Sequence, residues 1–217
     1  LSLHDALPIS PQREYDMLIS VGERISCSLL AMALAAKSVP AVSFTGSQAG
    51  IVTTEEHTEA KIVDVRPFRL KPFIQMGNVI IVAGFQGVSQ GGAITTLGRG
   101  GSDTTAVALG IALGAGRVEF YKDVDGIYTQ DPKKQLNAEH LPVLEYRQAV
   151  ALIEKTGKIL HPRCVLLAEK NQVELHIASF HQWNDPSGLR TIIRGCGQKP
   201  LEPVYELNRT SPEKIGV

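Results

Sequence analysis

A glycine-rich stretch at residues 95–105 contains the side chains of this sequence that are best suited to chemistry. Its sequence, TTLGRGGSDTT, places glycines and a serine next to Arg99, so the backbone can turn sharply and approach a ligand closely. A glycine turn that opens a helix offers backbone N–H groups and the positive end of the helix dipole to an anion. The guanidinium of Arg99 can hold a carboxylate through two parallel hydrogen bonds. The stretch is therefore predicted to bind a phosphate or a carboxylate.

The alternative is a plain turn, since glycine-rich connections occur in many folds without a ligand. Here an arginine, a hydroxyl and a carboxylate stand together at Arg99, Ser102 and Asp103, where a helix is expected to begin. A turn does not require these groups, so the functional interpretation is preferred. Ser102 or Asp103 is also predicted to cap the helix that follows.

Composition restricts the class of protein. The chain has 217 residues, 43% of them hydrophobic and 20% charged, which predicts one globular domain with a sizeable core. Its 22 basic and 22 acidic residues balance, so we expect a small-molecule partner rather than nucleic acid. Cys27, Cys164 and Cys196 form no CxxC pair, which argues against a disulfide framework or a zinc site and favours the cytoplasm. The longest apolar run, at 29–36, is shorter than the roughly 18 residues that span a bilayer, so no membrane role is expected.

The elements that must position these residues alternate between strands and helices. Strands are predicted at 39–44, 61–65, 79–83, 117–122 and 173–178, and helices at 22–37, 102–115, 146–156 and 162–171. The apolar strand at 79–83 is typical of a parallel strand buried on both faces, and it is expected to lead into the glycine stretch. The alternation predicts an α/β fold with a mostly parallel sheet and a ligand site beyond the carboxyl ends of its strands.

Four stretches at such strand ends or helix starts carry a family resemblance. They are SVGER at 20–24, the glycine stretch, YKDVDGIY at 121–128 and GKILHP at 157–162. As a set they resemble the aspartate kinases of the amino-acid kinase family, whose segments run SxGERIS, ITTLGRGGSD, YxDVDGxYTxDP and GxKxLHP. The resemblance covers about Tyr15 to Arg194. It implies a three-layer α/β/α sandwich with a mostly parallel sheet, and transfer of the ATP γ-phosphoryl group to the β-carboxylate of L-aspartate.

The resemblance also implies which residues hold the amino acid. They are Arg99 with the backbone of Gly100, Gly101 and Ser102, while Glu23 faces the ammonium group of the substrate. From the sequence alone, Arg99 could instead form a surface ion pair, and Glu23 could be a first-turn glutamate favoured by the helix dipole.

Asp103 is the catalytic candidate. By resemblance it lies near the phosphates and orients catalytic groups, and helix capping is an equally weighted role. A carboxylate substrate is already a competent nucleophile, so catalysis is expected to rest on alignment and charge neutralisation rather than on a general base. Mg²⁺ is expected as the counter-ion of ATP, although no protein ligands for it can be identified in the sequence.

The nucleotide-binding candidates also follow from the resemblance. They are Lys122, Asp123, Tyr128, Lys133, Lys158 and Ile159, with Tyr128 near the base and Asp123 toward the ribose or phosphates. An exposed turn at 123–126 is the alternative for the first segment, and Lys158 could instead interact with a helix C-terminus. His161 is expected to be structural, because it precedes Pro162 where a helix opens.

The domain organisation is predicted in three parts. Residues 1–11 are expected to lie outside the domain, 12–195 to form the kinase domain, and 196–217 to lead toward ACT regulatory domains. No segment similar to the family's KFGGTS is present, so the chain is expected to be an internal fragment that binds nucleotide weakly and has very low activity. The parent enzyme is expected to be a homo-oligomer acting in lysine, threonine and methionine biosynthesis.

Other functions remain possible from the sequence. Another kinase of the superfamily, acting on acetylglutamate, glutamate or a nucleoside monophosphate, would share much of the pattern, although LGRGGSD favours aspartate. A non-catalytic module that binds an amino acid or a nucleotide is a second alternative. An NAD-binding Rossmann domain is the least favoured, since no GxGxxG follows the first strand.

Overall fold

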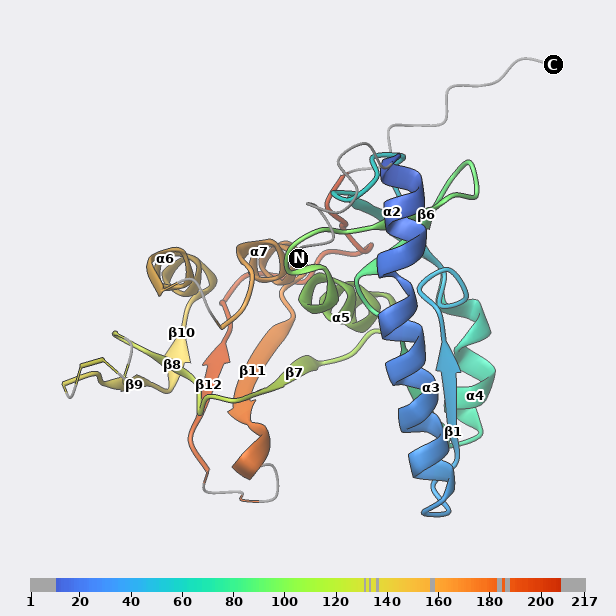
Figure 1. The fold of residues 1–217 in the computed structure, drawn as a ribbon. Helices are drawn as coiled ribbons and strands as arrows, with labels where there is room; N and C mark the ends of the chain where they lie inside the picture. The colour runs from blue at the N-terminus through green and yellow to red at the C-terminus, as the bar shows by residue number, and fades with distance from the viewer. Residues whose placement is uncertain are drawn as a thin grey trace. The chain divides into compact units, whose positions relative to one another are not determined.

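The computed structural model divides the chain into two compact units (Figure 1). It describes residues 11–130, 132, 134, 135, 137–156, 159–182, 185 and 188–207. Unit 1 is formed by Leu1–Thr105 with Tyr205–Val217, and unit 2 by Ala106–Val204. The domain bounds expected at residues 12–195 and 196–217 stay a prediction.

The described part of unit 1 begins with two consecutive helices, α2 (Gln12–Ile19) and α3 (Val21–Ala35). Helix α3 packs on strand β1 and matches the helix predicted at 22–37. Helix α2 was not predicted, because its sequence QREYDMLI has few apolar residues from which a helical period could be recognised. It packs against strand β6, which precedes the glycine stretch.

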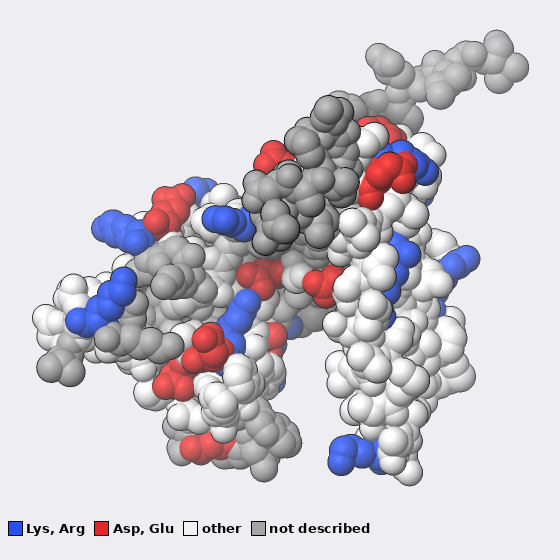
Figure 2. Space-filling model, in the orientation of Figure 1, with Lys and Arg blue, Asp and Glu red and all other residues white. Residues whose placement is uncertain are grey.

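Among the described residues, one helical segment is long and apolar enough to cross a membrane by length and composition alone. The segment is Gln12–Ala35. Its most apolar 18-residue stretch has a mean hydropathy of 1.5, and 11% of that stretch is buried. Figure 2 shows few charged side chains over α3. One such helix is weak evidence for a membrane-spanning segment, since core helices of soluble proteins and N-terminal signal sequences share this property. The sequence analysis missed it because Glu23 and Arg24 interrupt the apolar run.

Two sheets follow in unit 1. Their strands are β1 (Ala41–Phe44), β2 (Ile51–Thr53), β3 (Ile62–Val65), β4 (Val79–Val82), β5 (Gln86–Ser89) and β6 (Ile94–Thr96). Strands β1 and β4 form a parallel pair, and the second sheet has the order β3-β2-β5-β6. In it β2 and β5 are parallel, and the other two pairs are antiparallel. Two short helices, η1 (Pro67–Arg69) and α4 (Lys71–Gln75), precede β4.

The chain reaches the glycine stretch by a different route from the one expected. Strand β4 does not lead into it directly, because the antiparallel pair β5 and β6 intervenes and β6 delivers the chain. Helix α5 (Gly101–Ala112) then begins at Gly101, so Ser102 and Asp103 lie in its first turn and neither is the N-cap. The helix thus starts one residue earlier than the predicted start at Ser102.

Unit 2 contains a four-stranded sheet of order β10-β12-β11-β7. Its strands are β7 (Arg117–Lys122), β10 (Val143–Leu144), β11 (Glu174–Ser179) and β12 (Arg190–Ile193), with β7–β11 and β10–β12 parallel and β11–β12 antiparallel. A separate antiparallel pair joins β8 (Ile127–Tyr128) to β9 (His140–Leu141), and η2 (Phe180–Gln182) follows β11. Helices α6 (Tyr146–Thr156) and α7 (Pro162–Asn171) pack together and confirm the bounds predicted for them. The side chain of His161 caps α7 by accepting a hydrogen bond from Arg163 N at 3.3 Å, as its expected structural role requires.

Candidate functional site

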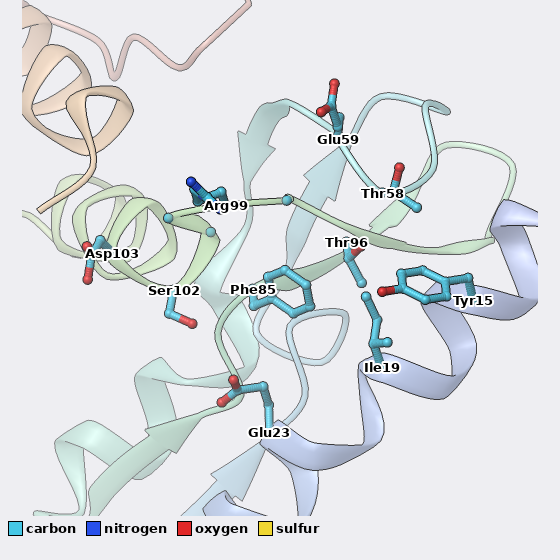
Figure 3. A pocket seen from close by; sticks show the side chains of 13 residues that line it. Tyr15, Ile19, Glu23, Thr58, Glu59, Phe85, Thr96, Arg99, Ser102 and Asp103 are labelled. Atoms are coloured by element: carbon cyan, nitrogen blue, oxygen red, sulfur yellow. The ribbon is translucent and has the colours of Figure 1, made fainter. Parts of the chain in front are cut away.

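A pocket of about 750 Å³ in unit 1 collects every residue predicted to hold the amino acid (Figure 3). Glu23 from α3 lines it together with Arg99, Gly100, Gly101 and Ser102, and so does the catalytic candidate Asp103. Glu23 is separated from the glycine stretch by more than sixty residues, so the fold and not sequence proximity brings these groups to one cavity.

The glycines of the stretch are required by their neighbours. Gly98 and Gly100 have φ values of +70° and +73°, which a side chain disfavours. A Cβ atom on Gly98 would lie 2.8 Å from the carbonyl oxygen of Thr58, and one on Gly101 would lie 2.9 Å from Phe85 Cδ2. The glycines therefore allow close contact with Thr58 and Phe85, which line the pocket, and the predicted close approach to a ligand stays a prediction.

The pocket presents both signs of charge. Arg99 is exposed and Glu23 is half-buried, and Figure 3 shows them on opposite sides of Phe85. Between them the first turn of α5 contributes backbone N–H groups at the positive end of a helix dipole. Arg99 is the cation of the lining, and Glu23, Glu59 and Asp103 are its carboxylates. A guanidinium and a carboxylate beside a helix N-terminus are complementary to a zwitterion.

Two hydrogen bonds of the Gln86 side chain, called the brace below, fix the start of α3 beside the pocket. Arg24 Nε donates to Gln86 Oε1 at 3.1 Å, and Gln86 Nε2 donates to the carbonyl oxygen of Ser20 at 2.8 Å. Gln86 is 1% exposed, so these bonds are shielded from water. The brace orients Glu23, which lies between Ser20 and Arg24. One turn further along, burial and then the charge of Glu23 raise the pKa of the Cys27 thiol.

Phe85 is a pocket residue that the sequence analysis missed. Its φ is +69°, a conformation that is strained for a bulky side chain. Two hydrogen bonds hold it: its N–H donates to Thr105 Oγ1 at 3.1 Å, and its carbonyl accepts from Leu97 N at 2.9 Å. The other missed lining residues are Tyr15, Ile19, Thr58, Glu59 and Thr96. Thr96 belongs to the glycine stretch, whereas the other four come from α2 and the segment at 58–59, which carry no motif in the sequence.

The nucleotide candidates that the structure describes lie in unit 2. Lys122 ends β7, with its Nζ 5.7 Å from the centroid of the Phe120 ring, and Asp123 follows in the bend predicted at 123–126. Tyr128 lies in β8, and its pKa is raised by burial and then by Asp125. Ile159 is half-buried just before α7. Lys133 and Lys158 lie outside the described residues.

A metal site is not evident. The described ranges contain no group of three or more His, Cys, Asp or Glu side chains placed to hold a metal ion.

Comparison with known families assigns the fold. The sequence profile of the amino acid kinase family matches residues 3–179. The chain belongs to the amino acid kinase family. Among solved amino acid kinases, E. coli aspartokinase III in complex with aspartate and ADP superposes with a TM-score of 0.77 at 30% identity, covering 88% of this chain and 43% of that one. Aspartate kinase from Synechocystis gives a TM-score of 0.73 at 37% identity, covering 93% and 32%. The predicted fold class, the α/β/α sandwich of the amino-acid kinases, is thereby confirmed.

Curated amino acid kinases give the same result at higher identity. Aspartokinase from Mycolicibacterium smegmatis is 48% identical over 189 residues, which are 87% of this chain and 44% of the relative. Aspartokinase from Corynebacterium glutamicum is 50% identical over 189 residues, again 87% and 44%. The chain thus spans about half the length of the curated relatives it matches.

Proposed function

We propose that this chain is the substrate-binding part of an aspartate kinase, which phosphorylates the β-carboxylate of L-aspartate with ATP to give 4-phospho-L-aspartate. The observation that carries the proposal is the shared pocket of Glu23 and Arg99 at the N-terminus of α5. The similarity to aspartokinases, one of them solved with aspartate and ADP, supports it. The biosynthetic role in lysine, threonine and methionine formation, the cytoplasmic location and a homo-oligomeric whole protein are proposed with it.

Glu23, Arg99 and the glycine stretch each have a task in this proposal. Arg99 binds the α-carboxylate through its planar fork, and Glu23 binds the ammonium group. The backbone of Gly100, Gly101 and Ser102 fixes the substrate against the helix start, where the N–H of Gly101 itself donates to the carbonyl oxygen of Gly98 at 3.1 Å. No side chain is needed as a general base, because the β-carboxylate is already ionised at neutral pH.

Catalysis in the proposed reaction consists of alignment and charge neutralisation. Asp103, in the first turn of α5, is proposed to orient the groups around the transferring phosphoryl. ATP is proposed to bind through Lys122, Asp123, Tyr128, Lys133, Lys158 and Ile159. Mg²⁺ would accompany ATP as its counter-ion.

The test is aspartyl phosphate formation, trapped as the hydroxamate, by the chain fused to a KFGGTS-containing family segment. Activity is expected, and Arg99→Ala should abolish it. Arg147→Ala is the matched control, since Arg147 is an exposed arginine of unit 2 paired with Glu169. A folded protein that binds ATP and L-aspartate without forming hydroxamate would support a binding module instead. Hydroxamate on glutamate but not on aspartate would indicate a sister kinase.

A further inference from the structure

We propose that Asp16 is a positioning residue that sets the affinity of the pocket for its amino acid, although it does not line the pocket itself. The proposal rests on the proposed function only for the identity of the ligand. Asp16 lies in α2 and is 0% exposed. Burying a carboxylate destabilises the folded state unless several hydrogen-bond donors compensate the lost hydration. The donors around Asp16 therefore indicate the structural role of this residue.

Those groups are the wall of the pocket. Oδ1 accepts from Thr96 Oγ1 at 2.6 Å, and Oδ2 accepts from Thr96 N at 3.1 Å. The amide of Thr58 donates to both oxygens, at 3.2 Å and 3.1 Å. Thr58 and Thr96 both line the pocket. The remaining partner is His57 Nδ1, 2.7 Å from Oδ2.

The bond to Thr58 holds a conformation that the chain would not adopt unaided. Thr58 has a φ of +68°, which is a genuine outlier for a β-branched residue. Its carbonyl oxygen approaches Gly98 so closely that a Cβ there would clash. The carboxylate of Asp16 therefore fixes both the strained peptide and the contact between Thr58 and the glycine stretch.

The bonds to Thr96 connect a second wall. Thr96 ends β6 within the glycine stretch, and its carbonyl accepts from Ala60 N at 3.0 Å. Tyr15 and Ile19, which flank Asp16 on α2, also line the cavity. Figure 3 shows Tyr15, Ile19 and Thr96 gathered at one end of the pocket, with Thr58 above them. One carboxylate thus joins α2, the segment 57–60 and β6 behind the binding surface.

The experiment compares Asp16→Asn with a matched substitution. Asn keeps the shape but replaces one acceptor oxygen by a donor, so the hydrogen bonds of Thr58 and Thr96 cannot all be kept. We expect the Kd of L-aspartate, measured by calorimetry on the whole chain, to rise about tenfold while the Kd of ATP is unchanged. Amide hydrogen exchange at Thr58 and Thr96 should accelerate.

Asp64→Asn is the control. Asp64 is a buried aspartate of the same unit, 8% exposed in β3 and bonded to Arg66 at 2.6 Å, and it does not line the pocket. It should leave the aspartate Kd and the exchange of both threonine amides unchanged. A rise in the aspartate Kd equal to that of Asp16→Asn would show a general stability effect and overturn the proposal.

The remaining outcomes separate this proposal from the proposed function. If the wild-type chain binds no L-aspartate, the proposed substrate is wrong. The positioning role of Asp16 is then tested by amide hydrogen exchange alone. It is overturned if the Thr58 and Thr96 amides exchange as slowly in Asp16→Asn as in wild type. If wild type binds and Asp16→Asn binds equally well, the positioning role is overturned while the function stands. If Asp16→Asn does not fold, His57→Leu removes one bond to the same carboxylate, and an unchanged aspartate Kd in that variant overturns the proposal.

Discussion

The ring of Tyr128 meets the imidazole of His140 edge to face, with the ring centroids 5.2 Å apart and the planes at 70°. This contact joins β8 to β9, where the two residues are directly paired in the antiparallel register. Burial lowers the pKa of His140 below its ordinary 6.5, and the opposing effect of Asp125 is smaller. The folded chain therefore favours the neutral imidazole beside the ring proposed to contact the nucleotide base.

Acidification should destabilise unit 2 through this histidine. The pKa of His140 is lower in the folded than in the unfolded chain, so as the pH falls below 6.5 the unfolded chain binds the proton first. The free energy of unfolding therefore decreases as the pH falls from 6.5 through the lower pKa of the folded state. The unfolding temperature should fall between about pH 7.5 and about pH 5.5, and it should fall less in His140→Gln than in wild type. An identical drop in both proteins would contradict this.

Glu23→Gln should weaken binding of aspartate selectively. Loss of a charged partner for the ammonium group costs about 1.5–3 kcal/mol, or at least a tenfold rise in Kd. Succinate has both carboxylates but no ammonium group, so its affinity should not fall in the variant. Calorimetry with both ligands gives the comparison, and an equal loss for succinate would show that Glu23 acts through the fold.

Gly98→Ala should destabilise the protein more than Gly114→Ala. Both glycines have a φ of +70°, so each alanine has the same backbone strain of about 1 kcal/mol. Only at Gly98 does the new Cβ meet an atom, Thr58 O at 2.8 Å, whereas nothing lies within 4 Å at Gly114. Urea unfolding should place Gly98→Ala about 1–3 kcal/mol below Gly114→Ala. Equal losses would mean that the Thr58 carbonyl moves aside freely.

Tyr146→Phe should cost about 1 kcal/mol in the free energy of unfolding. The hydroxyl of Tyr146 is buried and donates to the carbonyl of Val173 at 2.9 Å, so its removal leaves that carbonyl without this donor. Burial, followed by Glu174 and Glu169, raises the pKa of Tyr146 to about 12. The stabilisation that the protonated Tyr146 gives the folded state is thus complete below the ordinary pKa of 10, and it is lost as the pH rises through about 12. Ultraviolet titration of wild type and variant measures this directly, and a phenol that titrates near 10 would contradict the burial.

The sequence was sufficient wherever a segment carries its own pattern. Helices α6 and α7 match their predicted bounds because apolar spacing and Pro162 act locally. Motifs were equally informative for the pocket, since SVGER and the glycine stretch each place side chains at a helix start. The family resemblance predicts that Glu23 and Arg99 hold the same substrate, and both line one cavity, while their roles stay a prediction.

What the sequence could not provide depends on contacts between distant segments. Strands β5 and β6 are short and rich in polar residues, and their pairing replaces the direct path from β4 to the glycine stretch. Asp16 gives no signal in a polar helix that looks exposed, because only the folded chain surrounds it with Thr58 and Thr96. The same holds for the positive φ of Phe85, which its tertiary hydrogen bonds impose.

The return of the chain to unit 1 has a consequence for biosynthesis. Tyr205 is 7% exposed within that unit, and Glu206 Oε2 accepts from Ile62 N at 2.8 Å. A ribosome releases the chain from its N-terminus, so β3 is synthesised long before the residues that complete its hydrogen bonds. The whole of residues 106–204 must emerge in between, and it can fold while β3 still presents an open amide. Unit 1 is therefore started before unit 2 and completed after it.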